Sequence, residues 1–406
     1  MVAPPRDVFT HPRLEYEALT HTIGLIDLSN VGVLRLRGAD RVRFLNAMVT
    51  NDVAKLAAGT ACDALLTTTK GRIVAELLIL SRAEELLVLV MQGSTQRVFE
   101  AFDSHIIADD VQLTDMSAEM AMFSLEGPKS REVVWRLFPR EPLPLELLKF
   151  TENEYQGLHA MVVRHSVTGE KGMHVIVSRG QAERMHDFLV QAGIGMDMQL
   201  VGRVAWNMRR VEAGLPWYGL DISEDNFPKE ARLDTHVSYE KGCYLGQETI
   251  ARMHYRGHPN WLLAGLVAGD DAPESLAYPE RMEKIGELWS QVRDAGAVNT
   301  DAAALSLDRA AGAELFTPEA DDVQSISNAI SEGSPVSEGQ SPRKAAGRIT
   351  SGAMSPRLKH ALFLGYVRAA HAEVGTKFRA RVAGVDLTLT VVALPLPGPI
   401  KGDKHA

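Results

Sequence analysis

The residues best suited to chemistry lie between positions 210 and 248. A carboxylate, Glu212, stands just before a helix stop at Gly214, and a cysteine, Cys243, follows Lys241 in a segment punctuated by glycines. Loops carry reactive and binding groups because a rigid scaffold can aim them. The plainer interpretation of either piece is an ordinary turn, with Cys243 as a small buried apolar residue.

Glu212 is expected on the margin of a buried helix face. Apolar residues recur at helical spacing before it, namely Leu200, Val204, Met208 and Val211. A partly buried carboxylate is costly unless donors satisfy it. Those donors could be internal, from Arg209 or Arg210. They could instead come from a ligand with two adjacent N–H groups, which a carboxylate accepts as a fork.

Cys243 is the second pivotal residue. A thiol acts as a nucleophile or metal ligand in its thiolate form, which neighbouring cations favour. Lys241, with Arg252 or Arg256, could supply that charge. No His/Asp partner stands at a spacing that identifies a catalytic triad. We therefore expect a reactive or ligand-contacting thiol rather than a hydrolytic nucleophile, and we expect Cys62 to be a core residue.

The segment from Lys241 to Glu248, K-G-C-Y-L-G-Q-E, resembles the hallmark of the YgfZ-type folate-binding proteins. That family is related to the glycine-cleavage T-protein (aminomethyltransferase). Two further stretches resemble the same family, one near the N-terminus (Gly38–Val53) and one near the C-terminus (Gly347–Val367). The resemblance covers nearly the whole chain except one insertion.

This resemblance implies an α+β fold of the T-protein type. Two mixed α/β subdomains, interleaved within residues 1–255, and a small C-terminal β-barrel, formed by residues 256–269 and 343–398, would surround a central folate site. Tetrahydrofolate or another folate derivative would be the cofactor. By resemblance, the residues that bind it are Glu212, on the pterin ring, together with Lys241, Tyr244, Gln247 and Arg256.

The resemblance also implies a function, that of a tetrahydrofolate-binding accessory protein in iron–sulfur cluster assembly or repair. The partners would then be folate and iron–sulfur assembly proteins or their client enzymes. Cys243 is the candidate reactive thiol in this interpretation. A weaker alternative is an RNA-modification factor that contacts RNA directly.

The main alternative is a folate-dependent C1 transferase of the aminomethyltransferase type. Those enzymes carry an Asp-Asp pair after a Gly-Gly turn, and one Asp assists attack by the folate amine. The matching segment here has Ala75 and the longer Glu76. Acid–base catalysis depends on placement within hydrogen-bond reach, and a shift of about an ångström can cost ~100-fold in rate. We therefore expect no classical aminomethyltransferase activity.

The composition fits a cytoplasmic protein. At 406 residues and 45% hydrophobic, the chain can bury more than one core, which suggests two or three domains. Its two cysteines are too few for a disulfide framework or, alone, for an iron–sulfur cluster, which usually needs about four thiolates. The sequence has no apolar run of about 18 residues and no N-terminal signal segment. We expect a monomer that does not associate with membranes.

The charge of the chain is unevenly distributed. Residues 270–341 carry 15 acidic and 4 basic side chains, so this stretch accounts for the net charge of −9 and the remainder is close to neutral. Its low aromatic content and its end rich in Ser, Gly and Pro predict an acidic, largely disordered insertion over residues 270–342. The sequence shows no basic stripe of the kind that a phosphate backbone requires, so direct nucleic-acid binding is not expected.

Residue patterns also place the main elements. Strand-like runs bounded by Gly, Ser or charged residues occur at Val31–Arg37, Ile73–Ser81, Leu86–Met91, Ala160–Arg164 and Met173–Ser178. Helical spacing predicts helices around 42–49, 98–106, 185–192 and 200–211. The barrel strands are expected at Trp261–Ala268, Phe363–Val367, Lys377–Val382 and Leu387–Ala393. The acidic insertion therefore falls between two barrel strands.

Overall fold

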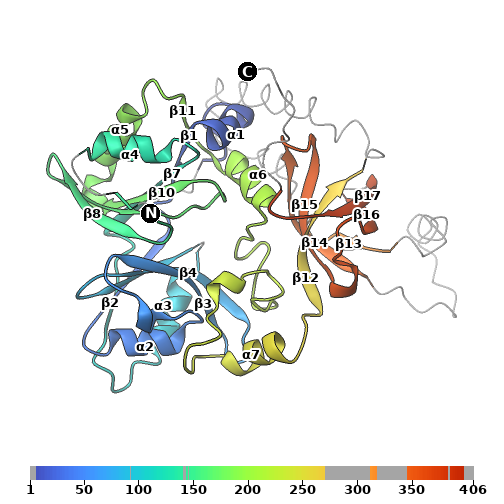
Figure 1. Ribbon diagram of the computed structural model, residues 1–406, viewed down its shortest axis with the longest axis horizontal. Coiled ribbons are helices and arrows are strands. Elements are labelled where there is room, and N and C mark those ends of the chain that lie inside the picture. Colours follow the sequence, from blue (N-terminus) through green and yellow to red (C-terminus); the bar gives the residue numbers. More distant parts are fainter. Residues whose placement is uncertain are drawn as a thin grey trace.

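The protein folds into three β-sheets with helices packed on and between them (Figure 1). The computed structural model describes residues 6–91, 93–139, 143–144, 146–269, 311–317, 345–382 and 385–396. The helices are α1 (Pro12–His21), α2 (Arg41–Met48), α3 (Thr95–Asp103), α4 (Ser130–Leu137), α5 (Ala182–Ala192), α6 (Arg203–Ala213) and α7 (Gln247–Tyr255).

The first sheet lies at the upper left of Figure 1 and has six strands in the order β11-β1-β7-β10-β9-β8. Helices α4 and α5 pack against one of its faces and bury a continuous apolar cluster there. The strands are β1 (Ile23–Asp27), β7 (Met120–Glu126), β8 (Phe150–Tyr155), β9 (Leu158–Val163), β10 (Gly172–Ser178) and β11 (Met198–Leu200).

The second sheet lies below the first and has five strands in the order β3-β4-β5-β2-β6. Helices α2 and α3 cover one face, where their apolar side chains meet those of the strands. The strands are β2 (Gly32–Arg37), β3 (Thr60–Thr67), β4 (Ile73–Ser81), β5 (Leu86–Val90) and β6 (Gln112–Asp115). Because β1 belongs to the first sheet and β2 to the second, the two sheets are interleaved along the chain.

The third sheet is C-terminal and has the order β13-β14-β15-β12-β17-β16. Its outer strands approach each other through one antiparallel bridge, between Phe316 and Arg379. The predicted small barrel is therefore a curled six-stranded sheet that the described strands do not close completely. The strands are β12 (Trp261–Ala268), β13 (Glu314–Leu315), β14 (Gly347–Ser355), β15 (His360–Arg368), β16 (Lys377–Val382) and β17 (Val385–Val392).

A short stretch of the predicted insertion 270–342 belongs to this sheet. Strand β13 pairs with β14, and Leu315 is completely buried in the apolar core of the sheet. The two-residue strand is too short to show an alternating pattern, so composition concealed it. The rest of the predicted insertion lies outside the described residues.

Helix α6 stands at the centre of the molecule, between α1 and strand β14 (Figure 1). It ends as predicted, because Gly214 adopts a left-handed conformation (φ 75°) that suits glycine at a helix C-terminus. The largest apolar cluster includes side chains from all three sheets, such as Ile26, Leu78 and Leu364. This shared core fixes the three sheets relative to one another.

Candidate functional site

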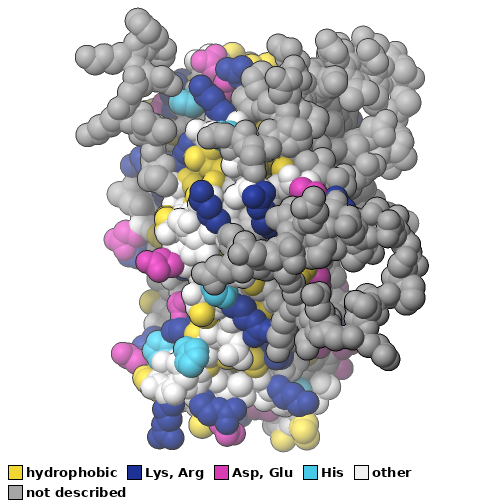
Figure 2. Space-filling view, turned by 90° about the vertical axis from the view of Figure 1, so that its right-hand side faces the viewer, with side chains coloured by type: hydrophobic (Ala, Val, Ile, Leu, Met, Phe, Trp, Pro, Cys, Tyr) yellow, Lys and Arg dark blue, Asp and Glu magenta, His cyan; other side chains and the backbone are white. Residues whose placement is uncertain are grey.

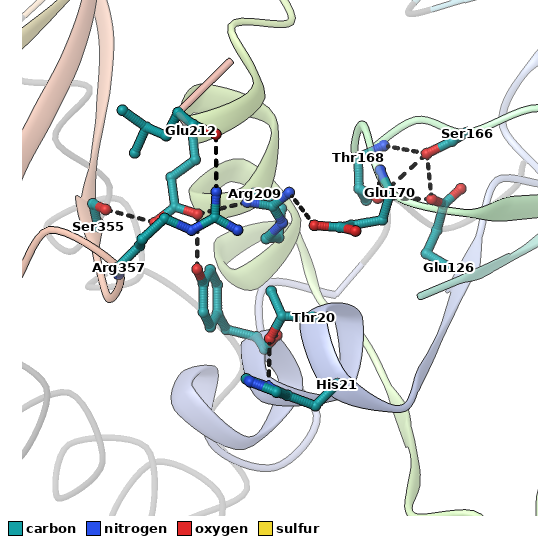
Figure 3. A network of polar contacts seen from close by, with 12 residues as sticks. Thr20, His21, Glu126, Ser166, Thr168, Glu170, Arg209, Glu212, Ser355 and Arg357 are labelled. Atoms are coloured by element: carbon teal, nitrogen blue, oxygen red, sulfur yellow. Dashed lines mark hydrogen bonds and ion pairs between the residues drawn. The ribbon is translucent and has the colours of Figure 1, made fainter. Parts of the chain in front are cut away.

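Glu212 lies at the C-terminal end of α6, where it is almost completely buried. One carboxylate oxygen, Oε2, accepts from Tyr16 Oη at 2.7 Å and from Arg209 Nη1 at 2.6 Å. The other, Oε1, accepts from Ser355 Oγ at 2.5 Å and from the Arg357 amide at 3.4 Å. Figure 3 shows these donors converging on the carboxylate from α1, α6 and the segment around Ser355.

The internal pairing that the sequence left open is therefore present, with Arg209 as the partner. Both oxygens of Glu212 already accept hydrogen bonds from the protein, and the ion pair with Arg209 offsets the cost of burial. In this arrangement Glu212 joins α6 to α1 and to the third sheet. Its role as a pterin ligand stays a prediction.

Lys241 is also satisfied by protein groups. Its ammonium donates to the carbonyl oxygens of Asn46 (2.5 Å), Val49 (2.8 Å) and Asn51 (2.6 Å), at and after the end of α2. Burial lowers the pKa of Lys241 to about 8. Its charge favours the thiolate of Cys62, whose pKa burial nevertheless raises to about 12. Lys241 is thus a cation at a helix C-terminus, where the carbonyl groups attract it.

The other residues predicted from the cysteine segment follow Lys241 along the chain, and the Lys241 ammonium lies 5.1 Å from the centre of the Tyr244 ring. Cys243 is exposed and, with Tyr244, lines a hollow of about 500 Å³ against α2, which Phe44 and Met48 also line. Tyr244 is buried. Gln247 is the first residue of α7, and the exposed Arg256 follows its last turn.

These positions separate the predicted site into two parts. In Figure 1, α7 lies at the bottom of the molecule beside the second sheet, whereas α6 with Glu212 lies in the upper centre. The segment from Lys241 to Glu248 is not one continuous loop. Instead, helix α7 begins at Gln247, directly after Gly246, whose left-handed conformation (φ 82°) allows the turn into the helix.

Glu76 on β4, in the second sheet, is a candidate for acid–base chemistry. Its carboxylate lies 3.5 Å from Nε2 of His236, and both side chains are largely buried. Burial lowers the pKa of His236, but the hydrogen bond and charge of Glu76 outweigh this effect and raise the pKa above its usual value. By contrast, Ala75 is completely buried in the core under α2 and α3.

The alternation of side chains along β4 explains this difference, because neighbouring residues of a strand point to opposite faces. Glu76 therefore points to the face of the sheet opposite α2 and α3, and this position retains a carboxylate. The substitution at Ala75 therefore removes no acid from that face. This weakens the sequence argument against transferase chemistry.

A second carboxylate, Asp63 on β3, shares the face of Glu76. The register pairs Asp63 with Leu78 and Leu65 with Glu76, so the two acids are diagonal neighbours. Asp63 Oδ1 lies 2.9 Å from Nε2 of His165. Burial alone would raise the pKa of Asp63. The hydrogen bond and charge of His165, together with the charge of His236, outweigh this effect, so the pKa of Asp63 is lowered.

Glu230, next to Arg72 at the start of β4, is a further buried acid that the sequence analysis missed. Its side chain is only 7% exposed, and burial raises its pKa. One oxygen accepts from the Phe227 amide at 3.1 Å and lies 3.8 Å from Arg72, whose guanidinium stacks on the Phe227 ring. Within the described part of the chain, Oε1 of Glu230 accepts no hydrogen bond.

Tyr366 on β15 lies close to Glu230 and Asp221. Burial, with the charges of Asp221 and Glu230, raises its pKa. Its hydroxyl is buried and has no hydrogen-bond partner among the described residues. We give the name carboxylate site to two groups of side chains taken together, namely Asp63 and Glu76 with His236, and Glu230 with Arg72 and Tyr366.

The surface and the helices give two further observations. On the face shown in Figure 2, Lys and Arg side chains occur in separate groups among acidic, histidine and uncharged residues, without a continuous basic stripe. In the described ranges, none of the helices is long and apolar enough to cross a membrane.

Comparison with known proteins identifies the fold and the family. Residues 4–241 match the family model "GCVT N-terminal domain", and residues 320–396 match "Glycine cleavage T-protein C-terminal barrel domain". A solved structure of glycine cleavage system aminomethyltransferase T from Bartonella henselae superposes with a TM-score of 0.72 at 21% identity. The match covers 94% of this chain and 88% of that one.

Similar sequences give the same result. An aminomethyltransferase from Bacillus cereus (strain G9842) is 31% identical over 287 residues, which cover 70% of this chain and 78% of the relative. The aminomethyltransferase of Bacillus mycoides (strain KBAB4) matches with the same identity and coverage. These comparisons do not single out the YgfZ-type branch that the cysteine segment suggested. The chain belongs to the glycine cleavage T-protein family.

Proposed function

We propose that this protein binds tetrahydrofolate and transfers a one-carbon unit at the carboxylate site. The observation that carries the proposal is the pair formed by Glu76 and His236, 3.5 Å apart. A carboxylate beside a histidine can accept a proton from an attacking amine and hold it, as general acid–base catalysis requires. The family relationship supports tetrahydrofolate as the cofactor. It also favours the transferase alternative over the accessory role.

Glu230 is a better candidate for the pterin ring than Glu212. A pterin presents two adjacent N–H donors, and a carboxylate accepts them best when its oxygens are not already engaged. Four protein donors occupy Glu212, whereas Glu230 receives one amide hydrogen bond and retains a free oxygen. The buried Tyr366 hydroxyl nearby would gain a partner from the same ring.

The accessory role in iron–sulfur cluster assembly remains the second candidate. The observation that favours it is the exposure of Cys243 beside a hollow on α2. An exposed thiol there is available to a partner protein or its cluster. The carboxylate site does not require this thiol, so the two functions can be tested separately.

One assay distinguishes the two candidates. Purified protein is given tetrahydrofolate and an aminomethyl-lipoyl carrier, and formation of methylene-tetrahydrofolate is measured. We expect turnover that Glu76→Gln lowers by about 10²–10⁴-fold, the usual contribution of a positioned acid or base. Cys243→Ser should leave turnover unchanged. Absence of turnover in the wild type, with loss of cluster-enzyme activity in cells that carry Cys243→Ser, would favour the accessory role instead.

A further inference from the structure

A line of buried polar side chains begins at Asp63 in the carboxylate site and continues into the first sheet. His165 lies 2.9 Å from Asp63 through Nε2 and 2.9 Å from Nε2 of His174 through Nδ1. Nδ1 of His174 lies 2.9 Å from Ser124 Oγ, which in turn lies 2.5 Å from Oε1 of Glu126. The last three side chains are at most 1% exposed.

The far end of this line is a carboxylate without a cationic partner. Glu126 accepts from the hydroxyls of Ser124, Ser166 and Thr168 and from the Val167 amide. Among the described residues, none of these partners carries a positive charge. Burial raises the pKa of Glu126, while these donors oppose the change. An uncompensated buried charge is costly. The protonation state of Glu126 therefore needs an explanation.

In one arrangement, the extra proton lies on His165, at the end of the line next to Asp63. If Glu126 is ionised, the hydrogen of Ser124 points to it, and Ser124 accepts from Nδ1–H of His174. Nε2 of His174 then accepts from Nδ1–H of His165. Because the carboxylate of Asp63 also accepts, Nε2 of His165 carries a hydrogen too, and His165 is an imidazolium.

In the other arrangement, the proton lies on Glu126, at the opposite end of the line. If Glu126 is protonated, it donates to Ser124, Ser124 donates to Nδ1 of His174, and Nε2–H of His174 donates to Nδ1 of His165. Both histidines are then neutral, and His165 still donates to Asp63. The two arrangements contain the same number of protons and the same heavy-atom contacts. They differ by the shift of three protons, each along one hydrogen bond, while Nε2–H of His165 stays in place.

The surrounding charges allow the proton to reside at either end of the line, on His165 or on Glu126. Burial lowers the pKa of His165, but Asp63 and Glu126 outweigh it and raise the pKa, while the charge of His236 opposes them. Burial and the charge of His165 lower the pKa of His174 well below its usual value. His174 is thus suited to pass a proton on rather than to keep it.

We propose that Asp63, His165, His174, Ser124 and Glu126 form a proton relay that stores one proton in the interior and exchanges it with the carboxylate site. This role rests on the proposed one-carbon transfer. It gives Asp63 the task of the acid and Glu76 that of the base. The other four residues hold Asp63 in place and return a proton to it after it has given one up.

The proton count balances in this scheme. The N–H proton of the attacking folate nitrogen goes to Glu76 as that nitrogen forms its bond to carbon. The bond from carbon to the leaving group breaks, and the leaving group takes a proton from Asp63. Asp63 receives that proton from Nε2–H of His165, so the protein gains one proton at Glu76 and loses one at the relay.

Nitrogen NMR of ¹⁵N-histidine in the full chain tests the relay without an activity assay. We expect His165 and His174 to titrate together, as groups coupled by more than about one pK unit do. Ser124→Ala interrupts the line and should shift the titration of His165 by about one pH unit. The matched control is Ser130→Ala, which removes another buried hydroxyl, one bonded to the Lys171 carbonyl at 3.2 Å. Independent titration of the two rings, unchanged by Ser124→Ala, would overturn the relay.

The pH profile of turnover supplies the second measurement. Ser124→Ala should lower the turnover number by roughly tenfold or more, since positioned proton transfer contributes ~10²–10⁴-fold, and should leave the dissociation constant of tetrahydrofolate unchanged. Ser130→Ala should have neither effect. A wild type with coupled histidines but no transfer activity would contradict the proposed function alone. An active wild type with uncoupled histidines would contradict the relay alone.

Discussion

The two buried glutamates show how the number of available oxygens determines what a carboxylate can bind. Glu212 accepts from Tyr16 and Ser355, which lie 196 and 143 residues away along the chain. Its sequence context indicated a buried acid and named Arg209 as one internal partner. It could not indicate partners so distant in sequence. Glu230 had the opposite outcome, because it lies between positions 210 and 248 but the sequence analysis assigned it no role.

The first prediction separates these two glutamates. Glu230→Gln should weaken tetrahydrofolate binding by about 1–3 kcal/mol, because one accepting oxygen is replaced by a donor. Glu212→Gln should instead lower the free energy of unfolding by roughly 1–3 kcal/mol, because the buried Arg209 loses one of its two carboxylate partners and keeps only Glu170. Calorimetry and denaturant unfolding measure the two effects. The reverse pattern, with affinity lost in a stable Glu212→Gln variant, would restore the ligand role of Glu212.

The second prediction concerns the two thiols. Cys243 is exposed and Cys62 is buried, so an alkylating reagent should modify Cys243 faster in the native protein. Lys241→Met should leave the labelling rate of Cys243 nearly unchanged, because the ammonium is bound to three carbonyl groups of the α2 region. The same variant should melt at a lower temperature. A strong fall in the Cys243 rate would show that Lys241 activates the thiol after all.

At the scale of elements, long and mostly apolar strands could be predicted from the sequence, whereas a strand that mixes apolar and charged residues could not. The bounds of β4 and β12 agree with the strands expected from the sequence, since both are long and mostly apolar. Strand β3 was missed because Asp63 points inward, which breaks the alternation that identifies a half-buried strand. That residue belongs to the carboxylate site. The feature that concealed the strand is therefore the one with a functional role.

The third prediction concerns strand β13 inside the predicted insertion. Replacement of residues 270–310 by a short Gly/Ser bridge should leave cooperative unfolding intact, because their composition is too polar to form a core and loop length costs little. Extending the deletion through residue 317 removes β13 and the buried Leu315. That variant should lose about 2–5 kcal/mol of stability, the usual cost of emptying a core site of this size. Equal melting temperatures for the two deletions would show that β13 contributes nothing.

At the scale of the whole molecule, polar networks join the central helices to the third sheet and the second sheet to the first. Figure 3 shows the contacts of Glu212 and those of Glu126 side by side, with Glu170 and Arg209 between them. The first network joins α1 and α6 to the third sheet, and the relay joins the second sheet to the first. Buried networks of this kind favour one arrangement of the sheets, because any other leaves polar groups unsatisfied.

The contact between Asp63 and His165 makes this arrangement dependent on pH. The pKa of His165 is raised, so its contribution to stability is complete below the unfolded value of about 6.5 and is lost as the pH rises through the folded value. The pKa of Asp63 is lowered, so its contribution is complete above about 3.9 and is lost as the pH falls through the folded value. The full contribution therefore falls between about pH 4 and 6.5.

The fourth prediction follows from this window. Asp63→Asn should lower the free energy of unfolding by about 1–3 kcal/mol at pH 6, because His165 loses a charged acceptor. The difference between wild type and variant should shrink as the pH rises above 6.5, where the wild type loses the same interaction. The charge of Asp63 also helps to raise the pKa of His236, so the loss of that interaction adds to the difference and shrinks in the same direction as the pH rises. Denaturant unfolding at a series of pH values between 5 and 9 measures it, and a difference independent of pH would show that His165 carries no charge in the folded protein.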